Sequence, residues 1–320
     1  MKRTVLSSGV GARRRGGSAL TSRTVLGVVL VAAVLVAGAV FVGLRAVGAR
    51  PSGESLDLRS GELTYVDSAG LVRQAGRTGP ACQRVDVAAG TLVCLRATAI
   101  PAQSEIVVFD AAGERLRLSE WGTPSRARVS PSGNVVMWTV FRAGDSYLGG
   151  VGTFSTTAGI YDLRSGAHFG SLEDFKLMVD GVEHTADDVN YWGITFTRDD
   201  RTFYATAASG GKTWLVRGSL DTRVLTSVRE NVECPSLSPD GSRIAYKFRT
   251  GDLWRLHVLD LVSGNDVPLA ETRHLDDQPQ WLDDSFVAYG RDKGIWKVPA
   301  SGGGSPELVH ADAASPAVAR

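Results

Sequence analysis

One feature limits the possible folds more than any other: a tight turn recurs along the chain at a nearly constant interval. The turns carry Gly or Asp and lie at Gly90, Gly133, Asp200, Gly241 and Asp284. The intervals between them are 43, 67, 41 and 43 residues. A repeat of about 42 residues that contains four short strands is typical of propeller blades. A single small sheet cannot bury both of its faces, so such units are stable only when they stack on one another.

The repeats differ in how clearly they can be read. The clearest copy reads PSLSPDGSRIAY at 235–246 and continues as LWRLHVLD at 253–260. A second copy has VSPSG at 129–133 followed by VVMW at 135–138. A Ser-Pro-x-Gly sequence suits the turn, because Pro fixes φ and Gly accepts a positive φ. These copies predict turn-linked strand pairs in five blades.

The two chain ends supply a sixth blade. Residues 63–66 and 71–74 read as the second and third strands of a blade that has no first strand before them. The sequence SPAVAR at 315–320 reads as a first strand with nothing after it. We therefore expect an all-β six-bladed β-propeller of four-stranded antiparallel blades over residues 61–320. Its ends would meet in one closing blade and leave no free sheet edge.

The segment before the repeats has the composition of a transmembrane helix. Residues 24–44 (TVLGVVLVAAVLVAGAVFVGL) contain no charged residue, and a helix of about 21 residues spans the hydrocarbon core of a bilayer. Six basic residues precede the segment and two follow closely, so the positive-inside rule places the N-terminus in the cytoplasm. We expect a cytoplasmic basic stub at 1–23, a single-pass transmembrane helix at 24–44 and a linker at 45–60. The propeller would then be extracellular or periplasmic.

A cleaved signal peptide is the alternative interpretation of the same segment. The sequence VGA at 47–49 offers a small-residue cleavage site, and cleavage near Ala49 would produce a secreted protein. The uncharged stretch is longer than the apolar region of about 7–15 residues in signal peptides, which favours the anchor. Both interpretations export the body of the chain.

The net charge of +1 is the sum of two unlike parts. Residues 1–50 carry eight basic residues and no acidic ones, whereas residues 51–320 carry 27 basic and 34 acidic residues, a net of −7. A mildly acidic body disfavours binding to a phosphate backbone, so no nucleic-acid partner is expected. The expected partners are the membrane, through the helix, and an envelope or secreted protein. The oligomeric state stays open.

The repeat at 237–246 (LSPDGSRIAY) resembles the repeat of TolB-like six-bladed β-propellers, and the resemblance spans about residues 61–320. It implies a propeller fold and a location in the cell envelope. TolB also has an α/β domain before its propeller. We expect this chain to lack that domain, because a stub, a membrane segment and a linker occupy residues 1–60.

Two insertions point to a binding face. Strand direction brings the second-to-third loop of a blade and the link between blades to the same rim. The long interval of 67 residues contains extra length in the loop 142–157 and in the link 173–192, both on that rim over blades three and four. Insertions that gather on one face often mark the binding face of a repeat protein. The alternative is that both are tolerated surface insertions. The candidate binding residues are Tyr147, Phe154, His184, Asp187, Asp188, Tyr191 and Trp192.

The cysteines support export. Cys82 and Cys94 are equidistant from Ala88, the middle of a predicted turn. They would face each other across an antiparallel hairpin at a separation that a disulfide can bridge, and an oxidising compartment permits the bond. The alternative is that both are small buried hydrophobic residues.

Signals for catalysis are weak. The five His residues show no metal-ligand spacing, and no Gly-x-Ser-x-Gly motif is present. The pairs at 199–200 and 283–284 are read as turn residues. We expect no catalytic residue, metal or cofactor and predict a non-catalytic protein- or ligand-binding scaffold. The alternative is a propeller enzyme of the lactonase or hydrolase type with a site at the central channel. The first strands offer Arg126, Arg128 and Cys234 there, which do not make a carboxylate metal cage.

Overall fold

The computed structural model describes residues 55–142 and 155–319 of the 320-residue chain. All described strands belong to one compact unit, Gly53–Arg320. Within the described ranges, no helix is long and apolar enough to cross a membrane. The predicted stub and the predicted transmembrane helix at 24–44 lie outside these ranges, as do Tyr147 and Phe154.

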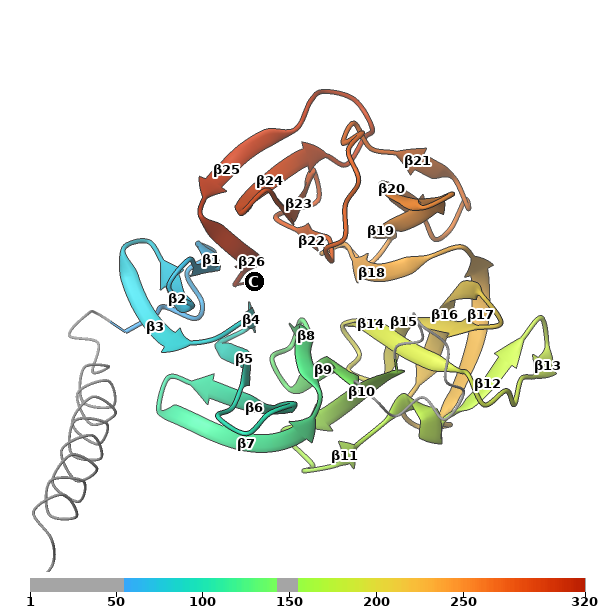
Figure 1. The fold of residues 1–320 in the computed structure, drawn as a ribbon, viewed down its shortest axis with the longest axis horizontal. Coiled ribbons are helices and arrows are strands. Elements are labelled where there is room, and N and C mark those ends of the chain that lie inside the picture. The colour runs from blue at the N-terminus through green and yellow to red at the C-terminus, as the bar shows by residue number, and fades with distance from the viewer. Residues whose placement is uncertain (1–54, 143–154, 320) are drawn as a thin grey trace, which may run out of the picture. The chain divides into compact units, whose positions relative to one another are not determined.

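Six sheets form a ring, with the first strand of each sheet nearest the centre (Figure 1). Blade 1 is built from both chain ends, and blades 2 and 3 follow in chain order. Blade 1 contains β26 (Ala313–Val318), β1 (Leu63–Asp67), β2 (Leu71–Gln74) and β3 (Arg77–Ala81). Blade 2 contains β4 (Arg84–Ala88), β5 (Thr91–Ala97), β6 (Gln103–Asp110) and β7 (Gly113–Trp121). Blade 3 contains β8 (Thr123–Val129), β9 (Val135–Arg142), β10 (Ser155–Asp162) and β11 (His168–Phe169).

Blades 4 to 6 complete the ring, and the four strands of each blade pair antiparallel as predicted. Blade 4 contains β14 (Asn190–Phe196), β15 (Thr202–Ser209), β16 (Lys212–Ser219) and β17 (Val224–Glu230). Blade 5 contains β18 (Glu233–Leu237), β19 (Arg243–Thr250), β20 (Leu253–Asp260) and β21 (Asp266–Pro268). Blade 6 contains β22 (Gln280–Trp281), β23 (Phe286–Arg291), β24 (Gly294–Pro299) and β25 (Glu307–Ala311).

The five recurring turns join the first and second strands of blades 2 to 6, as the period predicts. In the Ser-Pro-x-Gly turns the Gly N–H donates back to the first Ser carbonyl: Gly133 to Ser130 at 2.8 Å, and Gly241 to Ser238 at 2.9 Å. Both glycines have φ of +78°, a backbone conformation that Gly adopts without steric cost.

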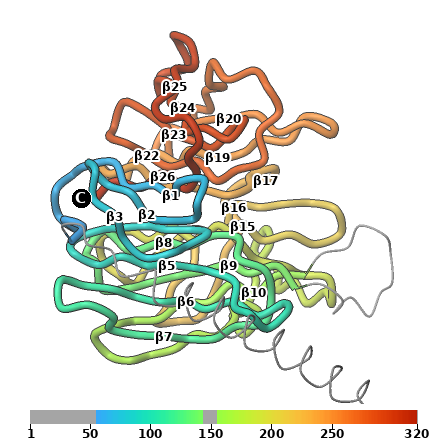
Figure 2. Tube along the Cα trace, turned by 60° about the vertical axis from the view of Figure 1, so that its left-hand side comes forward, coloured from blue at the N-terminus to red at the C-terminus, as the bar shows by residue number. Residues whose placement is uncertain are grey.

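The prediction that the two chain ends share one blade is confirmed. Strand β26 pairs antiparallel with β1, with Leu63 opposite Val318 and Asp67 opposite Ala313 (Figures 1 and 2). The Ser315 hydroxyl also accepts from the Val85 N–H at 2.9 Å and donates to the Val85 carbonyl at 3.1 Å. The last strand therefore closes blade 1 and fastens it to blade 2.

The core consists of six apolar clusters, one between each pair of neighbouring blades in the described ring. The second strands lie inside these clusters. In β9 the residues from Val135 to Val140 are all buried, because both faces of the strand are covered. This explains why the second strands read as nearly continuous apolar runs rather than as a simple alternation. Trp138 and Trp281 are each 1 % exposed and fill the spaces between blades.

The link 173–192 differs in part from the surface insertion that the sequence suggests. After a short 3₁₀ helix, η1 (Leu172–Asp174), it forms a hairpin of β12 (Lys176–Val179) and β13 (Val182–Glu183). Strand β12 pairs in parallel with β17 at the outer edge of blade 4, so this sheet has six strands. The outer edge of a blade offers unpaired backbone groups, and Leu177 is buried there. The rest of the link, from His184 onward, returns to the rim.

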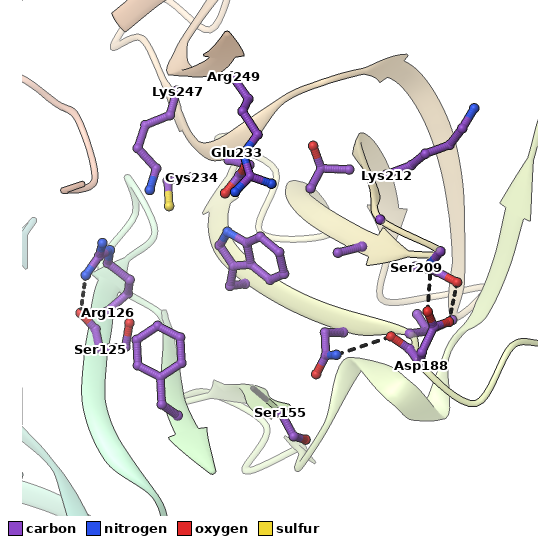
Figure 3. A pocket seen from close by; sticks show the side chains of 18 of the residues that line it. Ser125, Arg126, Ser155, Asp188, Ser209, Lys212, Glu233, Cys234, Lys247 and Arg249 are labelled. Carbon is purple, nitrogen blue, oxygen red and sulfur yellow. Dashed lines mark hydrogen bonds between the residues drawn. The ribbon is translucent and has the colours of Figure 1, made fainter. Parts of the chain in front are cut away.

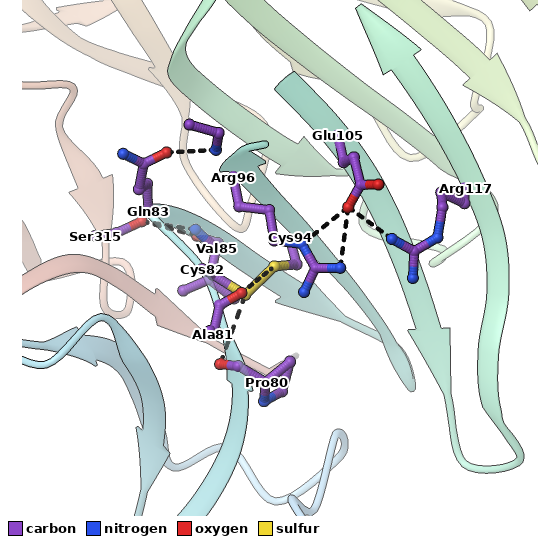
Figure 4. The surroundings of a disulfide bond; sticks show 11 residues. Pro80, Ala81, Cys82, Gln83, Val85, Cys94, Arg96, Glu105, Arg117 and Ser315 are labelled. Atoms are coloured by element: carbon purple, nitrogen blue, oxygen red, sulfur yellow. Dashed lines mark hydrogen bonds and ion pairs between the residues drawn. A yellow bond between two sulfur atoms is a disulfide. The ribbon is translucent and has the colours of Figure 1, made fainter. Parts of the chain in front are cut away.

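The predicted disulfide between Cys82 and Cys94 is present, with a Cα–Cα distance of 5.5 Å (Figure 4). The predicted geometry is wrong, however. Strand β4 begins at Arg84, and Val85 rather than Cys82 lies opposite Cys94. Cys82 precedes the hairpin, so the bond joins the link from blade 1 to the second strand of blade 2. Cys234 is free and buried.

Candidate binding cleft on the rim

A cleft of about 1110 Å³ opens on the rim where the second-to-third loops and the blade-to-blade links meet. Blades 3, 4 and 5 form its walls. They contribute the end of β9, the β15–β16 hairpin, and the starts of β8, β10, β14 and β18. This is the rim on which the sequence places both insertions.

The structure places the predicted binding residues in different surroundings. Asp187, Asp188 and Trp192 line the cleft. Tyr191 does not, because it is 3 % exposed and belongs to the core between blades 3 and 4. Burial raises the pKa of its phenol. His184 does not line the cleft either, but its Nε2 is 2.9 Å from Oγ of Ser209, which does.

One end of the cleft presents oxygen atoms. Asp188 accepts hydrogen bonds from the Ser209 hydroxyl and from the Gly210 N–H, the latter at 2.7 Å (Figure 3). These bonds lower the pKa of Asp188, so it is ionised at neutral pH. The order of the groups is Asp–Ser–His, with Ser209 in the middle. In a nucleophilic triad the His lies in the middle and takes the Ser proton, so this chain of contacts does not activate the hydroxyl.

The opposite end of the cleft is cationic. Figure 3 shows Arg126, Cys234 and Lys247 together at that end, away from Asp188 and Ser209. The Lys247 side chain is 4 % exposed, and its Nζ lies 2.7 Å from Asp276 Oδ1. Burial lowers the pKa of Lys247, but the neighbouring Cys234 and Asp276 outweigh that effect, so the pKa is raised overall. The amine is therefore charged at neutral pH.

Trp254 forms an aromatic wall between charged groups. Its indole N–H donates to Glu233 Oε1 at 2.8 Å. The Lys247 amine lies 4.7 Å and the Arg249 guanidinium 4.9 Å from the ring centroid. Cation–π contacts of this kind hold both a ring and its cations in place. The wall is thus a fixed surface that offers an aromatic face and both signs of charge.

Beneath the cleft, charged side chains fill the central channel. Arg84 Nη1 and Arg126 Nη2 lie 3.6 and 3.8 Å from Asp277 Oδ1, and Arg128 Nη1 lies 3.9 Å from Asp86 Oδ1. A small hollow of about 20 Å³ lies beside Arg84, Arg126 and Arg128. A separate hollow of about 400 Å³ opens at the other mouth of the channel.

Exposed apolar residues surround the cleft on the same rim. Trp121 is 63 % and Ile100 53 % exposed on blade 2. Phe141, on blade 3, lines the cleft and is 41 % exposed. Backbone pairing places these residues side by side, because Trp121 pairs with Gln103 near Ile100 and the following Thr123 pairs with Phe141. An exposed apolar surface, formed by Ile100, Trp121 and Phe141, therefore adjoins the cleft on this rim.

Several cleft residues have no motif in the sequence. The cleft also contains Ser209, Glu233, Lys247, Arg249 and Trp254, which lie on strands of blades 4 and 5 outside the two insertions. The sequence could have pointed to them only through their position in the repeat, because each lies near the rim end of a first, second or third strand. Within the described ranges, no group of three or more His, Cys, Asp or Glu side chains is placed to hold a metal ion.

No protein-family model and no curated protein sequence matches the chain. Several solved structures are similar to it in fold. TolB from Acinetobacter baumannii is 17% identical over 82% of this chain and 68% of its own, with a TM-score of 0.59. A chain of the nidogen/laminin complex is 12% identical over 81% of this chain and 98% of its own, with a TM-score of 0.53. A putative TolB from Agrobacterium tumefaciens is 11% identical over 77% of this chain and 88% of its own, with a TM-score of 0.48. The likeness to TolB from Acinetobacter baumannii supports the resemblance at the level of the fold: this chain has a TolB-like six-bladed propeller.

Proposed function

We propose that this chain is a membrane-anchored, extracytoplasmic propeller that binds an extended segment of an envelope or secreted protein in the rim cleft, without catalysis. The observation that carries the proposal is the cleft between blades 3, 4 and 5, which combines an aromatic wall with charged groups of both signs.

The charged ends of the cleft and the apolar surface beside it favour a protein segment over a small molecule. Small-molecule sites carry few polar groups, whereas Asp187, Asp188, Arg126 and Lys247 line this cleft. Ionic side chains lie at both of its ends. The exposed Trp121 and Ile100 beside it suit a partner that extends beyond the cleft, because exposed apolar surface of this kind marks protein interfaces.

Two features support a location outside the cytoplasm. The uncharged segment 24–44 with its basic flanks supports an anchor whose propeller is exported. The Cys82–Cys94 disulfide supports an oxidising compartment. The alternative, secretion after cleavage near Ala49, shares the compartment and differs only in the tether.

The channel and the Asp–Ser–His contact support binding rather than catalysis. Arg84 and Arg128 lie 3.6 and 3.9 Å from Asp277 and Asp86, so the charged groups of the channel pair with one another. The Ser209 hydroxyl donates its hydrogen bond to Asp188 rather than to a histidine base, so it lacks the arrangement of an activated nucleophile.

The cleft is tested by proximity labelling from the full chain in its native cells. The variant Asp187→Lys/Arg249→Glu changes both charge signs in the cleft and keeps the net charge. The matched control is Arg201→Glu/Asp221→Lys, which exchanges the partners of an exposed ion pair of 3.2 Å on the opposite rim. We expect the cleft variant to lose a labelled partner that the control retains. Identical labelling by both variants would contradict the proposal.

The location is tested by treating intact cells with an external protease and then separating membranes from soluble protein. We expect the propeller to remain with the membranes and to be released by cleavage in the linker 45–60. Release of the propeller without protease, with a new N-terminus near residue 50, would show secretion instead. Protection of the propeller until the cells are lysed would contradict export altogether.

A further inference from the structure

Two large apolar side chains lie exposed on the rim beside the cleft, and together we call them the apolar patch. Trp121, at the end of β7, is 63 % exposed, and Ile100, in the β5–β6 loop, is 53 % exposed. Within the described residues, the Trp121 side chain makes no hydrogen bond and no ring contact. Exposed apolar surface marks a site of contact with another molecule, and Trp is enriched among the residues that contribute most to binding.

Backbone hydrogen bonds hold the apolar patch in place. The Gln103 N–H donates to the Ile100 carbonyl at 3.2 Å, and Gln103 pairs with Trp121 across β6 and β7. The Gly122 N–H donates to the Ala102 carbonyl at 2.6 Å, which ties the end of β7 to the same loop. A surface that is already fixed loses little conformational entropy when a ligand covers it. The patch is therefore formed before any ligand binds.

The apolar patch is continuous with the cleft. Thr123 follows Trp121 by two residues and pairs with Phe141, and the Phe141 side chain lines the cleft. The patch itself lies outside the cleft lining. A ligand that covers both has to be long enough to reach from one to the other, as an extended protein segment is.

The link 173–192 lines the cleft with three carboxylates, those of Glu173, Asp187 and Asp188, and we call them the link carboxylates. Asp187 is exposed and has no hydrogen bond or ion pair in the part of the chain that the structure describes. Arg142 lowers the pKa of Glu173 and of Glu120, but burial outweighs it and raises the pKa of both. The positive charge of the protein therefore falls short of what these carboxylates would need.

The two lysines of the cleft do not supply that charge. Lys247 Nζ lies 2.7 Å from Asp276, and Lys212 Nζ lies 3.3 Å from Glu230, so each lysine already has a carboxylate of its own. The cationic end of the cleft lies away from Asp188 (Figure 3). A basic group of the ligand would supply the missing charge. The same carboxylates repel anionic lipid headgroups, which favours a protein segment over a membrane surface.

We propose that the apolar patch and the link carboxylates together bind a partner segment that carries bulky apolar residues and a basic residue. This inference rests on the proposed binding function and names the chemistry of the segment. Its apolar residues cover Trp121 and Ile100. Its Lys or Arg side chain crosses Phe141 into the cleft and pairs with a link carboxylate.

The test selects binders from a displayed library of random octapeptides, with the immobilised full chain in detergent as the target. A first passage over the Trp121→Ser/Ile100→Ser chain in the same detergent removes peptides that bind elsewhere. We expect the selected peptides to combine Lys or Arg with an aromatic or large aliphatic residue, and to be depleted in Asp and Glu, relative to the library.

Variants then locate the two contacts by fluorescence anisotropy of one selected peptide. Trp121→Ser/Ile100→Ser is expected to weaken binding at least about tenfold, as for loss of an aromatic anchor. Both side chains are exposed, so this variant keeps the fold. Val262→Ser is the matched control, because Val262 is 91 % exposed on the β20–β21 turn of the opposite rim. It is expected to change the affinity less than about twofold.

A second comparison tests the charge. Replacing the basic residue of the peptide with Gln is expected to weaken binding to the wild type about two- to fivefold, the range for an exposed charge pair. The same replacement should have no effect on binding to Glu173→Gln/Asp187→Asn/Asp188→Asn. The Asn at position 188 keeps an oxygen that can accept from Ser209 and Gly210.

The inference is overturned if the selected peptides show no excess of basic and apolar residues, or if the Trp121→Ser/Ile100→Ser chain binds the selected peptide like the wild type. Contact with lipid would overturn it as well. In bilayers of brominated phosphatidylcholine, that contact would quench the fluorescence of the wild type more than that of Trp121→Ser. If partner labelling in cells still depends on the Asp187/Arg249 pair in these cases, the proposed function stands and only the assigned chemistry of the segment fails.

Discussion

At the scale of single residues, the turn aspartates Asp199 and Asp283 accept hydrogen bonds from the backbone of their own turns. Asp199 accepts the N–H groups of Arg201 and Thr202, each at 2.8 Å. Asp283 accepts those of Ser285 and Phe286 at 2.7 and 2.9 Å. The prediction that these residues serve turns is therefore confirmed. Asx turns of this kind replace backbone hydrogen bonds that the turn cannot make.

Asp240 gives a residue-scale prediction with a defined pH dependence. Its carboxylate accepts hydrogen bonds from the Ser238 hydroxyl and from the Ser242 N–H and hydroxyl. Burial raises its pKa, but these bonds outweigh burial and lower the pKa from 3.8 to about 2. Because the folded-state pKa lies below the unfolded one, the stabilisation is complete well above pH 4 and is lost as the pH falls toward 2.

We therefore expect Asp240→Asn to lose about 1 kcal/mol of unfolding free energy at pH 7, a value reduced for the solvent exposure of this side chain. Urea unfolding at several pH values measures the loss. The gap from wild type should close as the pH approaches 2. Asp221→Asn is the control, because Asp221 is exposed and contacts only the Arg201 side chain. A gap for Asp240→Asn that stays constant down to pH 2 would contradict the assignment.

At the scale of elements, the local sequence pattern predicts that the two cysteines pair but does not predict which residues face each other across the hairpin. The spacing of the two cysteines predicts their bond, but it predicts the wrong strand register for the β4–β5 hairpin. The turn of this hairpin centres on Ala89 and Gly90 rather than on Ala88. The β12–β13 hairpin could not be predicted either. Its place depends on the free edge of β17, which is formed more than 40 residues later in the chain.

Replacing both cysteines with Ser should lower the unfolding free energy by about 3 kcal/mol, because the bond closes a short loop between the link and β5. In a domain of this size that loss corresponds to roughly 6–12 °C in melting temperature. Cys82→Ser alone should lose a similar amount, since either change breaks the bond. Scanning calorimetry without reductant measures the effect. Equal melting temperatures for wild type and double variant would rule out a stabilising role.

At the scale of the whole molecule, the ring was predictable and the cleft was only partly so. The turn period and the two incomplete chain ends are local features, and each maps directly onto a strand pair. The cleft instead brings together Arg126, Asp188 and Lys247 from three blades. No local pattern encodes which side chains meet across such distances, so only the insertion-bearing part of the rim, with Asp187, Asp188 and Trp192, was found.

The closing blade gives the prediction that belongs to the whole ring. Removing residues 315–320 deletes most of β26 and with it Ala317 and Ala319, which are 0 % and 3 % exposed in the cluster between blades 1 and 2. The Ser315–Val85 hydrogen bonds are lost as well, and β1 becomes a free edge. Because each blade is supported by its neighbours on both sides, we expect the ring to unfold as one unit at a melting temperature lower by more than about 10 °C.

A chain that ends at Ala319 keeps β26 and serves as the control. Hydrogen exchange would show faster opening in all six blades of the truncated protein. Exchange confined to blade 1, or an unchanged melting temperature, would mean that the ring does not depend on its closure.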